Sequence, residues 1–131
     1  MAILDKQLEF SDAQAVTATA ASTNVIDLDT AAPNIGSSAT PMYCEVRVNT
    51  TCTSNGSATI DAVLEHSADN SSFATLVAPA QVAVASATAG VVIMRVPLPA
   101  KHRRYLRIYY TIGTANLTAG KFDAFLTTGH N

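Results

Sequence analysis

The strongest constraint on the fold is an alternation of apolar and polar side chains that repeats every two residues in four segments. These segments are Tyr43–Val48, Ala58–His66, Arg104–Ile112 and Lys121–Thr127. In the first of them, Cys44, Val46 and Val48 share one face and polar or charged residues occupy the other. Side chains alternate between the two faces of a strand, whereas a helix repeats every 3.6 residues. The pattern therefore predicts antiparallel strands with one buried face each.

Turn-forming residues separate short apolar runs along the rest of the chain, which is typical of an all-β protein. Five more strands are expected at Asp5–Asp12, Asn24–Asp29, Phe73–Val77, Gln81–Ala85 and Val91–Leu98. Eight or nine short strands in 131 residues favour an antiparallel two-sheet sandwich, jelly-roll-like, in one domain that spans residues 1–131. Ala13–Thr23 contains β-branched residues that disfavour a helix, so we expect a loop or arm that orders only against a neighbour.

Composition and charge exclude several kinds of partner. Ten acidic and eight basic side chains give a net charge of −2, which argues against nucleic acid. The first residues lack the basic start and apolar core of a signal peptide, so Cys44 and Cys52 are expected to be reduced core residues. The uncharged run from Phe73 to Met94 is broken by proline, glycine and polar residues, so it predicts two strands and no membrane contact.

No reactive constellation stands out in the sequence. The three histidines, His66, His102 and His130, have no partner at the spacing of metal ligands. His66 is followed by Ser67 and Asp69, but catalytic triads assemble in space rather than from neighbours in one turn. We therefore expect no enzymatic activity, no metal and no cofactor.

One concentrated group of basic and aromatic residues is the candidate protein interface. It consists of Lys101, Arg103, Arg104, Tyr105, Arg107 and Tyr109. Arginine and tyrosine are enriched at protein interfaces, because each buries a large area and keeps a polar tip. Two other interpretations remain open at this point: a solvated turn that leads into a strand, and a nucleic-acid surface with the tyrosines as stacking platforms.

The sequence resembles the capsid cement, or decoration, proteins of short-tailed bacteriophages of the Bordetella-phage type. The resemblance covers nearly the whole chain and is carried by residues 1–17, 24–28, 64–73, 98–110 and 120–125. It is most specific in the opening segment and in the Leu-Pro…Tyr-Leu-Arg stretch, Leu98–Arg107.

This resemblance implies a jelly-roll-like structural virion protein on the outer surface of an icosahedral head. Its partners would be the major capsid protein, whose neighbouring copies it clamps, and itself, as a homodimer or alternatively a trimer. Such a protein is made in the host cytoplasm and needs no substrate.

A second class of function fits a β-sandwich of this size, namely a tail- or fibre-associated carbohydrate-binding module. Carbohydrate sites are usually lined with exposed aromatic side chains. The chain has no tryptophan and only 6% aromatic residues, which makes this the weaker hypothesis.

Overall fold

The computed structural model describes residues 9–28, 42–99 and 102–127. These residues form ten strands and one short 3-10 helix, so the prediction of an all-β fold is confirmed. The elements are β1 (Glu9–Ala15), β2 (Ala20–Ala21), β3 (Ile26–Asp27), β4 (Tyr43–Ser54), β5 (Thr59–Ser67), β6 (Ala74–Val77), β7 (Val82–Ala83), η2 (Val84–Ser86), β8 (Val92–Pro97), β9 (Tyr105–Gly113) and β10 (Leu117–Thr127).

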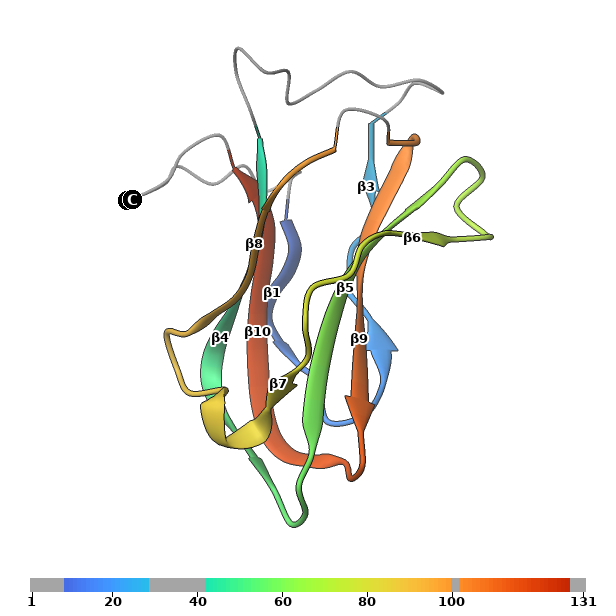
Figure 1. The fold of residues 1–131 in the computed structure, drawn as a ribbon. Coiled ribbons are helices and arrows are strands. Elements are labelled where there is room, and N and C mark those ends of the chain that lie inside the picture. The colour runs from blue at the N-terminus through green and yellow to red at the C-terminus, as the bar shows by residue number, and fades with distance from the viewer. Residues whose placement is uncertain (1–8, 29–41, 100–101, 128–131) are drawn as a thin grey trace.

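Two antiparallel sheets face each other in this sandwich (Figure 1). The β4 sheet has the strand order β1-β10-β4-β8. In the β9 sheet, β5 lies beside β9, with β2 and β3 on the far side of β9 and with β6 and β7 on the far side of β5. If β2 and β3 count as one interrupted strand, and β6 and β7 as another, the ten strands occupy eight positions. Eight positions in two four-stranded layers are the jelly-roll arrangement.

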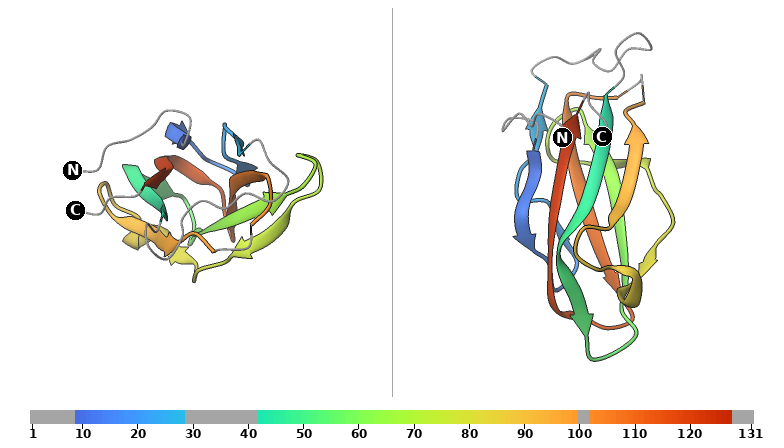
Figure 2. Two further views of the ribbon diagram at one scale, coloured as in Figure 1. Left: turned by 90° about the horizontal axis from the view of Figure 1, so that it is seen from above. Right: turned by 90° about the vertical axis from the view of Figure 1, so that its left-hand side faces the viewer.

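Figure 2 shows the two sheets one against the other. The core lies between them and is formed by side chains of the alternating segments, as predicted. The core residues of these segments are Cys44, Val46, Val48, Ala58, Ile60, Ala62, Leu64, Leu106, Ile108, Tyr110, Phe122, Ala124 and Leu126. Glu45, Phe125 and Thr127 are buried as well, although the alternation places them on the opposite face. The rings of Tyr110 and Phe122 lie 5.2 Å apart and connect the two sheets. Both cysteines are free and buried, as predicted, and burial raises the pKa of the Cys44 thiol well above its ordinary value.

Residues 13–23 differ from the expected loop or arm. β1 continues to Ala15, and β2 pairs Ala20 and Ala21 with Tyr110 and Tyr109 of β9. Gln81–Ala85 also differs, because only two of its residues form a strand before η2 begins at Val84. Such two-residue strands depend on hydrogen bonds to a neighbour far away in sequence, which no local pattern reveals. The first residues of the expected Asp5–Asp12 strand, and Asp29, lie outside the described residues.

The apolar stretch between Phe73 and Met94 forms β6, β7, η2 and the start of β8. Among the residues that the structure describes, no helix has the length and apolar character that a bilayer crossing requires.

Candidate protein interface

The outward side of β9 carries the central residues of the candidate interface. Leu106, Ile108 and Tyr110 of this strand are buried in the core. The alternation therefore turns Tyr105, Arg107 and Tyr109 away from the core, where each is half-buried. We call these three residues the outer β9 face. Because β9 has β5 on one side and β2 and β3 on the other, this face lies in the middle of its sheet.

Arg107 is held on several sides. Its Nε atom lies 2.7 Å from Glu65 Oε1, on the cross-strand neighbour in β5. Its guanidinium lies 3.9 Å from the centre of the Phe73 ring and 5.2 Å from the centre of the Tyr109 ring. Only 24% of the Arg107 side chain and 15% of the Glu65 side chain are exposed. A long side chain fixed in this way loses little rotamer freedom when a partner covers it.

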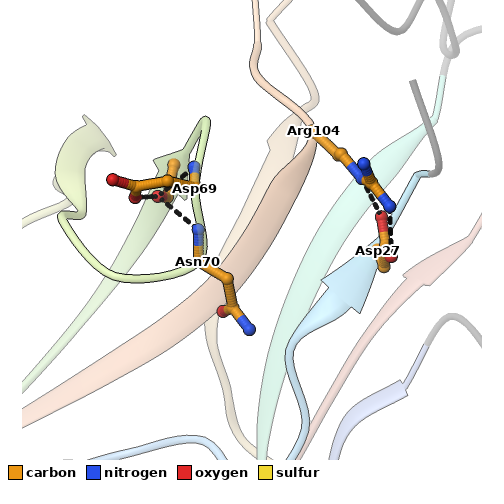
Figure 3. Close-up of polar contacts among 5 residues, drawn as sticks. Asp27, Asp69, Asn70 and Arg104 are labelled. Carbon is orange, nitrogen blue, oxygen red and sulfur yellow. Dashed lines mark hydrogen bonds and ion pairs between the residues drawn. The ribbon is translucent and has the colours of Figure 1, made fainter. Parts of the chain in front are cut away.

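Arg104 is also paired within the chain. Its Nε and Nη2 atoms lie 2.7 and 3.0 Å from the two carboxylate oxygens of Asp27, a two-pronged contact (Figure 3). Its guanidinium also lies 5.0 Å from the centre of the Tyr105 ring. Asp27 belongs to β3, so this ion pair ties the edge of the sheet to the start of β9. About a third of the Arg104 side chain remains exposed, and solvent weakens such a pair.

The described residues just before β9 differ in their surroundings. Lys101 lies outside the described residues. His102 is buried and its Nδ1 lies 2.7 Å from the carbonyl oxygen of Pro99, so Nδ1 carries the proton. Arg103 is exposed, and its backbone N–H donates to Nδ1 of His66 at 3.2 Å. The structure therefore joins two of the predicted arginines to carboxylates, where the sequence suggested a run of free positive charge.

The turn after β5 places Phe73 above Arg107. The hydroxyl of Ser67 accepts hydrogen bonds from the backbone N–H groups of Asp69 and Asn70, which has a positive φ of 59° (Figure 3). Oδ1 of Asp69 accepts from the N–H groups of Ser71 and Ser72, and these bonds lower the pKa of the Asp69 carboxyl. Ser67 and Asp69 thus have a structural role in the turn that connects the antiparallel strands β5 and β6.

Sequence reasoning missed four residues that support this surface. They are Asp27, Glu65, His66 and Phe73, and they lie in the stretches 24–28 and 64–73 that carry the resemblance to cement proteins. A pairing of the alternating segments in register would have placed Glu65 opposite Arg107. The contacts of Phe73 and His66 depend on the path of a turn and a loop, so alternation carries no signal for them.

The side chains of this surface are arranged around ring and ion-pair contacts. Within residues 9–28, 42–99 and 102–127, no group of three or more His, Cys, Asp or Glu side chains could hold a metal ion. The guanidinium of Arg107 is engaged with Glu65 in an ion pair and with Phe73 and Tyr109 in ring contacts. What the face offers is a rigid, mixed aromatic and guanidinium surface.

Comparison with known proteins agrees with this description. No curated protein matches the chain. The model of the Bbp16 family matches residues 10–126, which cover all of the core and all of the described interface residues. This match confirms the resemblance seen in the sequence. The chain thus belongs to the Bbp16 family, a Bordetella phage protein family in which Bbp16 is a capsid cement protein, and it is a phage structural protein.

Proposed function

We propose that this chain is a cement protein that binds the outer surface of an icosahedral phage head and clamps neighbouring major capsid proteins. Membership of a phage structural family supports a non-enzymatic role and association with a capsid. The observation that carries the proposal is the fixed position of Arg107 between Phe73, Tyr109 and Glu65. Arginine and tyrosine in well-packed surroundings are the residue types that dominate binding energy at protein interfaces.

The mechanism is passive. A protein that binds the assembled shell, and not the separated subunits, stabilises the shell by mass action. A contact of about 1,600 Å² is enough for specific recognition, and many copies on one head add their effects. The protein itself acts as a homodimer, with a trimer as the alternative.

The contacts of Arg104 and Arg107 suggest how the head is recognised. Each guanidinium already has a carboxylate partner within the chain, so neither contributes a free positive charge to a partner. Recognition through the outer β9 face then depends chiefly on aromatic area and hydrogen bonding. The contribution of the outer β9 face to binding should consequently weaken only slightly as salt is raised, because salt screens exposed charges most.

The test is binding of the purified chain to heads that lack it, measured by co-sedimentation. Tyr105→Ala and Tyr109→Ala are expected to weaken binding at least tenfold, the effect of losing about 1.4 kcal/mol at a hot spot. Tyr43→Ala is the matched control, because Tyr43 also lies beside an arginine, Arg95, with 5.0 Å between the guanidinium and the ring centre, but on the β4 sheet.

Equal losses in all three variants would show that the outer β9 face has no special role. If the wild-type chain does not bind heads at all, the cement proposal is wrong. Specific binding to a glycan array in that case would favour the carbohydrate-binding module instead.

A further inference from the structure

Arg103 differs from the other arginines of this surface. Arg104 and Arg107 are each joined to a carboxylate. The side chain of Arg103 is exposed, and within the described residues it makes no ion pair and no hydrogen bond. Its backbone, however, is fixed, because its N–H donates to Nδ1 of His66. Among the described residues of this surface, Arg103 thus carries a positive charge that no carboxylate pairs, and His66 fixes its backbone.

His66 lies where three elements meet. It is near the end of β5, opposite Ala74 of β6 and opposite Leu106 of β9. β6 carries no charged side chain, and the ionisable groups that act on His66 come from the segment before β9, namely Arg103 and His102. Among its neighbours along the chain, Glu65 is paired with Arg107 on β9, and Asp69 is engaged in the turn after β5.

The hydrogen bond restricts the protonation of His66. A backbone N–H only donates, so Nδ1 of His66 has to accept, which requires a neutral ring with its proton on Nε2. A protonated imidazole has a donor on both nitrogens. Protonation therefore sets two donors against each other and adds a positive charge beside Arg103.

We propose that Arg103 is the residue through which this surface recognises a carboxylate on its partner, and that His66 positions Arg103 as long as its ring is neutral. This inference rests on the proposed function for the partner, a capsid protein. Arg103 supplies a planar guanidinium suited to a carboxylate. His66 acts through the backbone and touches no partner.

The direction in which the pKa of His66 is displaced determines how its hydrogen bond to Arg103 depends on pH. Burial, followed by the charges of Arg103 and His102, holds the pKa of His66 below its ordinary value of 6.5. The unfolded chain takes up this proton at a higher pH than the folded one, so acidification weakens the native contact. The His66 contact is complete above pH 6.5 and is lost as the pH falls through the lowered pKa.

The positioning role is tested first on the free protein. In NMR spectra recorded from pH 8 to pH 4.5, the amide resonance of Arg103 should shift with the titration of His66. His66→Asn is the matched variant, since Oδ1 of asparagine occupies the place of Nδ1 and accepts at every pH. In this variant the Arg103 amide should show no transition below pH 6.5. An Arg103 resonance that ignores His66 in the wild type overturns the positioning role.

The recognition role is tested with heads. Arg103→Gln should weaken binding about three- to tenfold at pH 7.5, as expected for the loss of one hydrogen bond of ordinary net strength, and Arg103→Lys should restore only part of it. Lowering the pH through the lowered pKa of His66 should weaken the wild type and should weaken His66→Asn much less. Unchanged binding by Arg103→Gln overturns the recognition role.

If the wild type binds no heads, the proposed function and this recognition role both fail, while the NMR titration still decides the positioning by His66.

Discussion

Gly120 shows how closely the two longest strands approach each other. It lies in β10 with a φ of +154°, and a Cβ atom at this position would stand 2.8 Å from Sγ of Cys52 in β4. We expect Gly120→Ala to lower the free energy of unfolding by about 1–3 kcal/mol, the usual cost of overpacking a core. Chemical denaturation measures this change.

Two further variants separate the clash from the backbone strain in Gly120→Ala. Gly90 has a φ of +92°, and no atom lies within 4 Å of the place that a Cβ would take, so Gly90→Ala reports the backbone cost alone, about 1 kcal/mol. Cys52→Ala should recover part of the loss in the Gly120→Ala background, because it removes the sulfur atom. If Cys52→Ala recovers nothing, the close approach to Cys52 is not the cause.

The ionisation of Tyr110 makes the free energy of unfolding depend on pH in the alkaline range. Burial raises its pKa well above the ordinary value, although a hydrogen bond of 2.9 Å to Ser11 partly opposes this. Above about pH 10 the unfolded chain releases the tyrosine proton and the folded chain retains it, so stability falls as pH rises. We expect Tyr110→Phe to reduce this fall by up to about 1.4 kcal/mol per pH unit. Urea denaturation at pH 8 to 11 measures it, and parallel curves for the two proteins would contradict the assignment.

At the scale of elements, Gln14 explains why residues 20–23 lie against the sandwich. Its Oε1 accepts from Ser11 Oγ and from the backbone N–H of Thr23, and its Nε2 donates to the carbonyl of Ala21. Gln14→Ala should lower amide-exchange protection in residues 20–24 about tenfold and leave β4 and β10 unchanged. Asn24→Ala is the control, since it removes only one long side-chain bond, 3.4 Å to the carbonyl of Glu9. Equal protection in Gln14→Ala and the wild type would exclude this anchoring role.

Predictability from sequence also differs from element to element. The long strands β4, β5, β9 and β10 were predictable, because each buries one face and the alternation records it. The short strands β2 and β7 were not, since their backbone partners in β9 and β5 are remote in sequence. The candidate interface follows the same rule: the outward direction of Arg107 could be predicted, but its stacking on Phe73 could not, because a turn positions that ring.

At the scale of the whole molecule, the two outward faces lie on opposite sides of the sandwich (Figure 2). The β4 sheet also presents an arginine cluster, in which buried Glu45 lies between Arg47 and Arg95. A clamp has to contact two capsid subunits, either with two surfaces of one chain or with the same surface of two copies. If the chain clamps the head as proposed, its effect on the head depends on how much of the protein is bound.

This dependence gives a quantitative expectation for heads that lack the protein. Their disruption temperature, followed by the fluorescence of a DNA-binding dye during heating, should rise with the concentration of added chain and then level off. At a free concentration of 100 Kd the stabilisation is about 2.7 kcal/mol per site, and each tenfold increase adds about 1.4 kcal/mol until the shell fails by another route. Tyr109→Ala should shift the curve of disruption temperature against concentration to higher concentration. It should not lower the plateau, because each variant molecule, once bound, joins the same subunits. A disruption temperature that stays constant as bound protein accumulates would show that the chain decorates the head without cementing it.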